Sequence, residues 1–124
     1  MALLLDTHIV LWWLVDDPGL ADEIKESLDH EPEVYLSAAT VWEVAIKHAL
    51  GKLAGPEDLP ERVRGSGFRP LPIADRHAIA AARLPLHHRD PFDRMLVAQA
   101  LVEGLTLVTR DPEIQKYDVP LRAA

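Results

Sequence analysis

The sequence predicts an α/β domain with a mostly parallel sheet of four to five strands flanked by helices. Short apolar runs such as LLL and LTLVT alternate along the chain with stretches of helical periodicity, which is the pattern of parallel strands joined by helices. These runs lack polar alternation, as is typical of strands covered on both faces. The length of 124 residues, 48% of them hydrophobic and 27% charged, suits a single domain over residues 1–124.

The N-terminal part of the chain is expected to form one strand and two helices. The apolar run Met1–Leu5 is halted by Asp6 and predicts a fully buried strand. Thr7 is expected to cap the helix that follows, which continues to about Val15, where the sequence Asp-Asp-Pro-Gly breaks it. Residues 20–30 carry leucine and isoleucine at helical spacing and predict a second helix.

The middle of the chain contains the longest early helix. A short strand is expected at residues 33–36, and Ser37 is expected to cap a helix over residues 38–50, which ends at the glycine that follows it. A stretch rich in proline and glycine comes next, with one short helix at residues 60–64. Residues 68–73 predict a weaker extended segment.

The C-terminal part is expected to return to the sheet twice. An alanine-rich helix is predicted at residues 74–83 and a second helix at residues 91–103, again ended by a glycine. The run at residues 105–109 is a clear strand, after which Asp111 and a proline open a turn or short helix. Residues 119–121 are expected to form an edge strand.

The composition argues against several classes of protein. The formal net charge of −7 is unlike that of a protein that coats nucleic acid with a basic surface. The absence of cysteine excludes disulfides and thiolate metal sites and suits a reducing cytoplasm, where we expect the protein to reside. The longest apolar stretch, Ile9–Val15, is too short to span a membrane, and no basic residue precedes the N-terminal apolar run, so no signal peptide is expected.

Acidic residues occur at the ends of several predicted elements. Asp6 follows the first strand, Asp111 comes shortly after the strand LTLVT, Glu43 lies on the helix after the second strand, and Asp90 and Asp93 open the helix before LTLVT. Because ligands of parallel sheets bind beyond the carboxyl ends of the strands, these acids are expected to meet at one edge.

Each acid also has a purely structural explanation. Asp6 is a common residue for a turn from strand to helix. Glu43 stands four residues before Lys47, a spacing that gives an exposed ion pair worth about 0.3 kcal/mol. Asp111 precedes a proline and has the pattern of a helix N-cap, which local sequence alone favours.

The positions of Asp90 and Asp93 separate their roles. Asp90 precedes Pro91 and is the natural N-cap of the helix, with Asp93 in its first turn. Asp93 either reaches back to the cap or points along the axis toward the edge of the sheet, where the helix dipole favours its ionised form. We therefore expect Asp90 to be mainly structural and Asp93 to be available for function.

Several carboxylates at one edge repel one another and call for a cation. Since the chain offers no cysteine and no helical histidine pair at metal-binding spacing, Mg²⁺ or Mn²⁺ held by carboxylate oxygens is the expected partner. Such sites act on phosphate esters. Arg89, Arg94 and Arg110 adjoin the acidic motifs and are candidates for contacts with substrate phosphates, although arginine beside acids equally often forms salt bridges.

Four stretches together resemble the PIN domain, and more narrowly the VapC-type toxins of bacterial type II toxin–antitoxin modules. They read LLLDTHIVLWWL, SAATVWEVAIKHALGKL, HRDPFDRMLVAQAL and GLTLVTRD, and they follow the family's order over about residues 3–121. Each motif alone is weak, and the set is specific. The resemblance implies a PIN-like three-layer sandwich and a Mg²⁺- or Mn²⁺-dependent endoribonuclease that cuts tRNA or rRNA through a metal-activated water.

The resemblance also implies roles for individual residues. Asp6 and Asp93 correspond to the acids that hold the principal ion, and Glu43 and Asp111 to those that complete the catalytic metal site. Thr7 and Thr109 match the small hydroxyl positions that orient these acids, and Asp90 is a frequent companion outside the set of four. His87 and His88 are expected to be surface or loop residues, given the intermediate burial of histidine.

Partners are expected as well. Residues 10–14 are all apolar, so the helix that contains them is either enclosed in the fold or exposes an interface. The resemblance implies a homodimer and a hetero-oligomer with a cognate antitoxin whose tail blocks the acidic site.

Two other functions could use the same acidic residues. One is a metal-dependent phosphohydrolase acting on DNA or another phosphate ester, and the second is a PIN-like binding module without catalysis. The intact acid set argues against the second of these.

Overall fold

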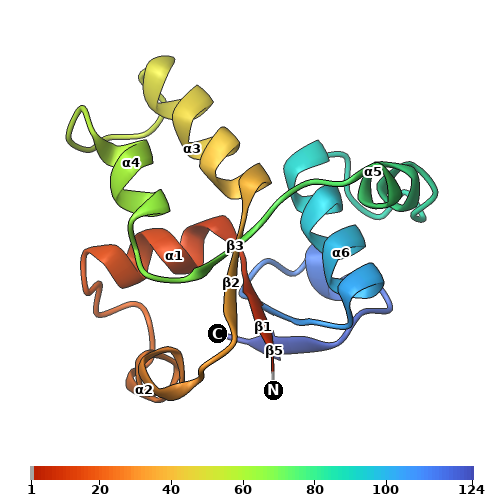
Figure 1. Ribbon diagram of the computed structural model, residues 1–124, viewed down its shortest axis with the longest axis horizontal. Helices are drawn as coiled ribbons and strands as arrows, with labels where there is room; N and C mark the ends of the chain where they lie inside the picture. Colours follow the sequence, from red (N-terminus) through yellow and green to blue (C-terminus); the bar gives the residue numbers. More distant parts are fainter. Residues whose placement is uncertain (1) are drawn as a thin grey trace.

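The structure, a computed structural model that describes residues 2–124, is built on one parallel sheet (Figure 1). The sheet has five strands in the order β3-β2-β1-β4-β5, and every neighbouring pair is parallel. The strands are β1 (Leu3–Leu5), β2 (Val34–Ser37), β3 (Arg69–Leu71), β4 (Thr106–Thr109) and β5 (Leu121–Ala123). The predicted α/β class is therefore confirmed, and the sheet has five strands where four to five were expected. Met1, the first residue of the predicted N-terminal strand, lies outside the described residues.

Helices connect the strands and cover both faces of the sheet, which makes three layers (Figure 1). Helices α1 to α4 lie on one side in Figure 1, and α5 and α6 lie on the other. They are α1 (Thr7–Leu14), α2 (Asp22–His30), α3 (Ala38–Ala49), α4 (Leu59–Arg64), α5 (Asp75–Ala82) and α6 (Pro91–Glu103). A single 3₁₀ turn, η1 (Ile114–Lys116), precedes β5.

Strand β1 shows why the sheet is covered on both sides. Its three leucines are all buried, with Leu3 and Leu5 in one apolar cluster and Leu4 in the other. Because successive side chains of a strand point to opposite faces, β1 contributes to both cores at once. This explains the unbroken apolar run LLL in the sequence.

The order of the strands creates a crevice at the end of β1. The chain passes from β1 to β2 and β3 on one side, and then returns to β4 and β5 on the other. Such a switch point leaves an opening beyond the carboxyl ends of the two central strands. Asp6 follows β1 there, and Thr109 is the last residue of β4.

A buried polar contact fixes the helices beside this crevice. The Ser37 hydroxyl accepts the Ala39 N–H at 3.0 Å, as an N-cap of α3, and donates to Oε1 of Gln99 on α6 at 2.5 Å. The Gln99 amide donates in turn to the Pro72 carbonyl at 3.3 Å. Ser37 and Gln99 are both fully buried, so this pair sets the relative position of α3 and α6.

Two local predictions were wrong. Asp6, not Thr7, is the N-cap of α1: its backbone is extended and its side chain accepts the Thr7 N–H, which leaves the Thr7 hydroxyl free to bind elsewhere. The edge strand begins after Pro120, not before it. The Pro120 carbonyl accepts the Leu107 N–H, and Leu121 is the first residue that pairs along β4.

The apolar helix α1 is largely enclosed. Ile9 and Val10 are fully buried, and Trp13 is half-buried against Phe68, with ring centroids 5.8 Å apart. Trp12 is half-buried beneath the guanidinium of Arg110, which lies 4.5 Å from its ring centroid. Among residues 2–124, no helix has the length and apolar character needed to cross a membrane.

Candidate active site

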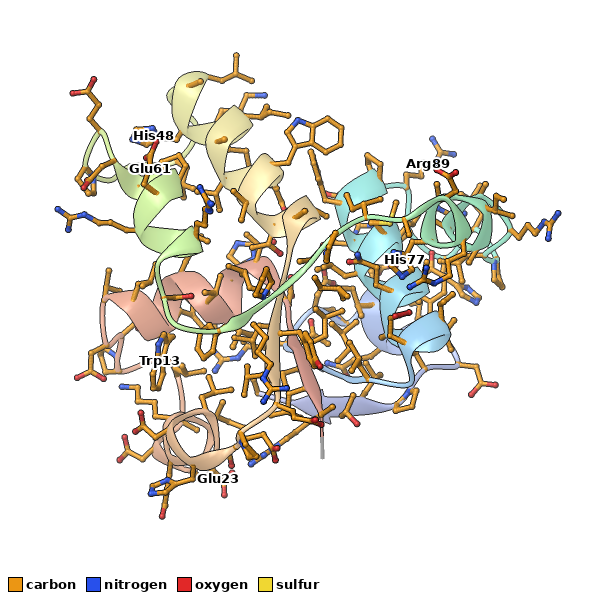
Figure 2. The ribbon with its side chains drawn as sticks, in the orientation of Figure 1. Trp13, Glu23, His48, Glu61, His77 and Arg89 are labelled. Carbon is orange, nitrogen blue, oxygen red and sulfur yellow. The ribbon has the colours of Figure 1, made fainter. Side chains whose placement is uncertain are left out.

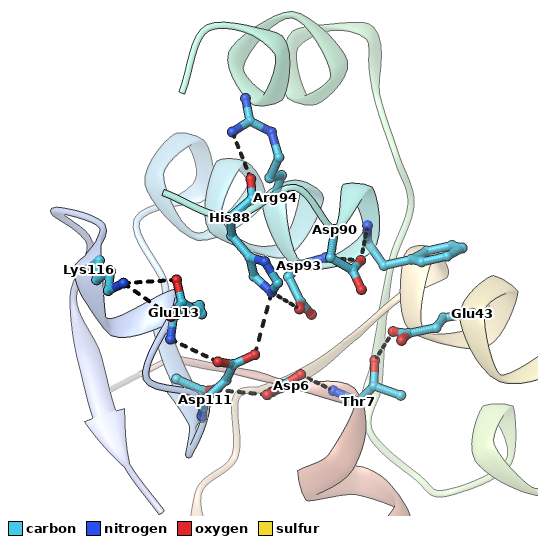
Figure 3. Close-up of polar contacts among 12 residues, drawn as sticks. Asp6, Thr7, Glu43, His88, Asp90, Asp93, Arg94, Asp111, Glu113 and Lys116 are labelled. Atoms are coloured by element: carbon cyan, nitrogen blue, oxygen red, sulfur yellow. Dashed lines mark hydrogen bonds and ion pairs between the residues drawn. The ribbon is translucent and has the colours of Figure 1, made fainter. Parts of the chain in front are cut away.

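Four acids from four different elements meet in the crevice at the switch point (Figure 3). Asp6 follows β1, Asp111 follows β4, Asp93 lies in the first turn of α6 and Glu43 lies on α3. Figure 3 shows the carboxylates of Asp6, Asp93 and Asp111 facing a common space. Glu43 lies next to them and is hydrogen-bonded to Thr7, the residue after Asp6. The structure thus brings together the four acids that the sequence singled out.

Asp6 is held by hydrogen bonds at the bottom of the crevice. The residue is only 4% exposed, its Oδ1 accepts the Thr7 N–H at 2.6 Å, and its Oδ2 accepts the Thr109 hydroxyl at 2.8 Å. Burial raises the pKa of Asp6 above its usual value, although these two hydrogen bonds and the nearby His8 oppose the rise. The Asp6 side chain is consequently held in one position, and its hydrogen bonds offset only part of the cost of burying its negative charge.

The Thr109 hydroxyl also orients Asp111. It accepts the Asp111 N–H at 3.0 Å, and Oδ1 of Asp111 accepts the Glu113 N–H at 2.8 Å. Asp111 is half-buried, and its second carboxylate oxygen faces the crevice (Figure 3). Asp111 therefore closes a turn before η1 with its Oδ1, but the N-cap of η1 is Glu113, so the predicted N-cap role of Asp111 was wrong.

Glu43 is anchored from the opposite side. It is 3% exposed, and its Oε1 accepts the Thr7 hydroxyl at 2.7 Å. Its Oε2 forms an ion pair with Lys47, four residues further along α3. Lys47 is part-exposed, and its pKa is raised, chiefly by the bond to Glu43 and further by the charges of Asp90 and Asp93. Glu43 therefore has both the ion pair expected of its spacing and a buried position beside Asp6.

Asp90 and Asp93 take the separate roles that their positions predict. Oδ1 of Asp90 accepts the N–H groups of Phe92 at 2.8 Å and Asp93 at 3.3 Å, which makes Asp90 the N-cap of α6, with Pro91 at the first helical position. The Asp93 side chain points into the crevice (Figure 3). Burial, followed by repulsion from Asp6, Asp90 and Glu43, raises the pKa of Asp93 from 3.8 to about 7, and His88 opposes this rise.

His88 was missed as a site residue. Its Nε2 lies 2.8 Å from Oδ2 of Asp93 and 3.6 Å from Oδ2 of Asp111, and its side chain is only 22% exposed. One feature of the sequence could have indicated this role. His88 stands two residues before Asp90, the N-cap of α6, and a residue there lies beside the first helical turn, which carries Asp93. His87, by contrast, is exposed as expected and stacks edge-on against Tyr117 at 5.0 Å.

The three arginines beside the acidic motifs have different surroundings. Arg94 donates to the carbonyls of residues 81, 84, 85 and 88 and to the Tyr117 hydroxyl. Arg110 donates to the carbonyls of Gly19 and Ala124 and stacks on Trp12. Arg89 is exposed at the surface beside α5 (Figure 2). Contacts within the fold therefore occupy Arg94 and Arg110, whereas Arg89 is accessible.

The donor set of the crevice fits a divalent cation. Carboxylate oxygens are the ligands of Mg²⁺ and Mn²⁺, and Asp6, Glu43, Asp93 and Asp111 can supply them, together with the imidazole nitrogen of His88. The raised pKa values of Asp6 and Asp93 show that these buried carboxylates are not fully compensated by the side chains around them. A cation is the partner that would compensate them.

The fold is that of a PIN domain. The family model for the PIN domain matches residues 3–120, and the chain belongs to this family. Ribonuclease VapC22 of Mycobacterium tuberculosis is 28% identical over 124 residues, which cover 94% of this chain and 92% of the relative.

Two solved structures have the same fold over nearly the whole chain. FitAcB from Neisseria gonorrhoeae is 27% identical, with a TM-score of 0.69 and coverage of 96% of this chain and 95% of the other. DNA-bound VapBC from Salmonella typhimurium has a TM-score of 0.76 at 20% identity and covers 99% of this chain and 98% of the other, a likeness of fold alone.

Proposed function

We propose that the protein is a divalent-metal-dependent endoribonuclease and the toxin of a VapBC-type toxin–antitoxin pair. The observation that carries the proposal is the meeting of Asp6, Glu43, Asp93 and Asp111 in one crevice of a PIN fold. The similarity to Ribonuclease VapC22, which extends over nearly the whole of both chains, supports RNA as the substrate. The substrate class that we expect is tRNA or rRNA.

The acids would hold Mg²⁺ or Mn²⁺, with Asp6 and Asp93 as principal ligands and Glu43 and Asp111 completing the site. A divalent cation supplies an activated water and neutralises charge on the leaving oxygen in phosphodiester hydrolysis. The side chains around the acids prepare them for this task. Thr109 and the Thr7 N–H hold Asp6 as a carboxylate, and the Thr7 hydroxyl directs Glu43 toward the crevice.

Substrate recognition is expected to depend on a few local basic contacts. The net charge of −7 gives no general attraction for RNA. Arg89 is exposed one residue before the cap of α6 and is the accessible arginine of the three candidates. We therefore assign the contact with RNA phosphate chiefly to Arg89, which predicts a shallow dependence of RNA affinity on salt.

An antitoxin is the expected protein partner. A groove of about 510 Å³ lies beside α3 and is lined by apolar side chains that include Val41, Trp42 and Phe68. Trp42 is 59% exposed and contacts Phe92 in the first turn of α6, with ring centroids 5.1 Å apart, so this side of the groove lies next to the turn that carries Asp93. A segment with an apolar part and a basic residue fits this surface. Trp42→Ala is expected to weaken antitoxin binding and to leave RNA cleavage by the free toxin intact.

Cleavage of a labelled RNA with and without metal tests the enzymatic proposal. We expect cleavage in Mg²⁺ or Mn²⁺, none in excess chelator, and recovery when the ion is restored. Asp6→Asn keeps the size of the side chain and should abolish activity. A DNA of the same sequence serves as the competing substrate. Equal cleavage of DNA, or activity that survives chelation, would contradict the proposal.

A further inference from the structure

The imidazole of His88 faces two of the acids without being part of the expected acidic set. Its Nε2 lies 2.8 Å from Oδ2 of Asp93 and 3.6 Å from Oδ2 of Asp111. One ligand atom from each of the three residues can be chosen so that all lie within 4.8 Å of one another. Figure 3 shows His88 above Asp111 and beside Asp93, on the side of the crevice away from Glu43.

These separations match those between ligands of one metal ion. Nitrogen and oxygen ligands lie about 2.0–2.2 Å from a first-row ion, and two of them at tetrahedral or octahedral angles are therefore about 2.8–3.6 Å apart. The distances of Nε2 to the two carboxylates, 2.8 and 3.6 Å, lie at the two ends of this range. Small shifts of the side chains would place an ion between all three residues.

The fold holds the backbone of His88 in place. The His88 N–H donates to the hydroxyl of Tyr117 at 3.0 Å, and the His88 carbonyl accepts from Arg94 at 3.4 Å. Tyr117 is itself buried, and Arg94 also donates to the carbonyls of Leu84 and Pro85 in the segment that leads to His88. The backbone of His88 is thus positioned by contacts independent of the acids, and the imidazole extends from it toward Asp93 and Asp111.

We propose that His88 supplies a nitrogen ligand, together with Asp93 and Asp111, on the Asp111 side of the metal site. A ligand set of one imidazole and two carboxylates favours first-row transition ions such as Mn²⁺, Co²⁺ and Ni²⁺ over Mg²⁺, which takes oxygen ligands. This inference deepens the proposed function and rests on it for the nature of the crevice. It adds that the site discriminates among divalent ions and that His88 causes the discrimination.

A competing explanation gives His88 the opposite effect. If the imidazole only compensates the charge of Asp93, a cation must displace it, and its removal should strengthen the binding of every divalent ion. A nitrogen ligand predicts instead that removal weakens the binding of transition ions selectively. His88→Gln separates the two, because the glutamine amide N–H can still donate to Asp93, whereas the side chain has no imidazole nitrogen to bind a metal ion.

The direct test is pulsed electron spin resonance of Mn²⁺ bound to the purified protein, which detects coupling of the ion to a ¹⁴N nucleus of imidazole. We expect this coupling in the wild type and in His87→Gln, the neighbouring exposed histidine, and its loss in His88→Gln. Absence of nitrogen coupling in the wild type, or its persistence in His88→Gln, overturns the proposal. The wild-type spectrum alone decides whether an imidazole nitrogen binds the Mn²⁺ ion. The test therefore remains valid even if the His88→Gln variant fails to fold.

Affinities complete the experiment. Titrations of Co²⁺ and Mg²⁺, followed by thermal shift, should show that the ratio of Co²⁺ to Mg²⁺ affinity falls at least about tenfold in His88→Gln. A uniform rise in both affinities overturns the proposal in favour of charge compensation. RNA cleavage is measured separately in Mg²⁺. A protein that binds Mn²⁺ through nitrogen and cleaves no RNA refutes the proposed function alone, and the converse result refutes the His88 ligand alone.

Discussion

The hydroxyl of Thr109 donates a hydrogen bond of 2.8 Å to Oδ2 of Asp6. The same hydroxyl accepts the backbone N–H of Asp111 at 3.0 Å. One buried side chain at the end of β4 therefore positions an acid after β1 and another after β4. These are the two central strands on either side of the switch point, so Thr109 couples the two halves of the crevice.

Removal of this hydroxyl should impair the site more than the fold. Thr109→Val keeps the shape of the side chain and deletes a hydrogen bond that lowers the pKa of Asp6, so the pKa of Asp6 should rise further. We expect RNA cleavage to fall at least about tenfold, with a loss of about 1 kcal/mol in the free energy of unfolding. Thr109→Ser retains the hydroxyl and is the control. Wild-type cleavage by the valine variant would show that the bond is dispensable.

Metal-free protein should lose stability as the pH rises. Burial and neighbouring acids raise the pKa of Asp93 from 3.8 to about 7, so folding favours its protonated form. The resulting stability is fully present below about pH 4 and is lost as the pH rises through about 7. Asp93→Asn, which cannot ionise, should be more stable than the wild type at about pH 8 by at least about 1 kcal/mol.

Urea unfolding in chelator at about pH 5 and about pH 8 measures this effect. Asp90→Asn serves as the control, because asparagine is an equally good N-cap and the substitution leaves Asp93 in place. An Asp93→Asn variant whose stability follows the same pH profile as the wild type would contradict the assignment of the loss to Asp93.

Lys47 is expected to matter most when no metal is bound. Its ammonium compensates the buried carboxylate of Glu43, and Lys47→Met leaves that carboxylate without its ion pair. The cost should be on the order of 1 kcal/mol in metal-free protein, since Lys47 is itself part-exposed. Saturating Mg²⁺ should reduce this cost. Thermal unfolding with and without Mg²⁺ makes the comparison, and an identical loss in both conditions would argue against a cation beside Glu43.

Arg94 and Arg89 should differ in what they support. Arg94 donates to four backbone carbonyls within residues 81–88, so Arg94→Leu should destabilise the protein by roughly 1–3 kcal/mol. Arg89→Ala changes an exposed residue and should leave the melting temperature unchanged while weakening RNA binding. Thermal unfolding and RNA binding assays on both variants separate the roles. A stable Arg94 variant with reduced RNA affinity would reverse the assignment.

Features that depend on neighbouring residues in the sequence were predictable. Asp90 followed by Pro91 is a cap and a first helical residue in any tertiary context, and the structure has both. The apolar runs of β1 and β4 indicate burial on both faces, and the parallel order of the strands then places Asp6 and Asp111 at one edge. The meeting of the acids was predictable because it follows from topology.

Features that depend on contacts between residues far apart in the sequence could not be predicted. His88 is positioned by Tyr117 and Asp111, which lie more than twenty residues further along the chain. In the sequence Arg94 stands beside the acids and has no evident partner. In the structure the loop before α6 packs against it, and Arg94 donates to carbonyls of that loop. Thr7 and Asp6 are both good caps, and the choice between them depends on Glu43, which binds the Thr7 hydroxyl.

The rate of RNA cleavage by Asp93→Asn, compared with that of Asp90→Asn in the same Mg²⁺ buffer, tests the proposed site most directly. Both substitutions remove one charge from the first turn of α6 and are nearly isosteric, but only Asp93 points into the crevice. We predict that Asp90→Asn retains most of the wild-type rate and that Asp93→Asn loses at least about a hundredfold. Equal rates in the two variants, or a greater loss in Asp90→Asn, would contradict the assignment of Asp93 as the metal-binding carboxylate.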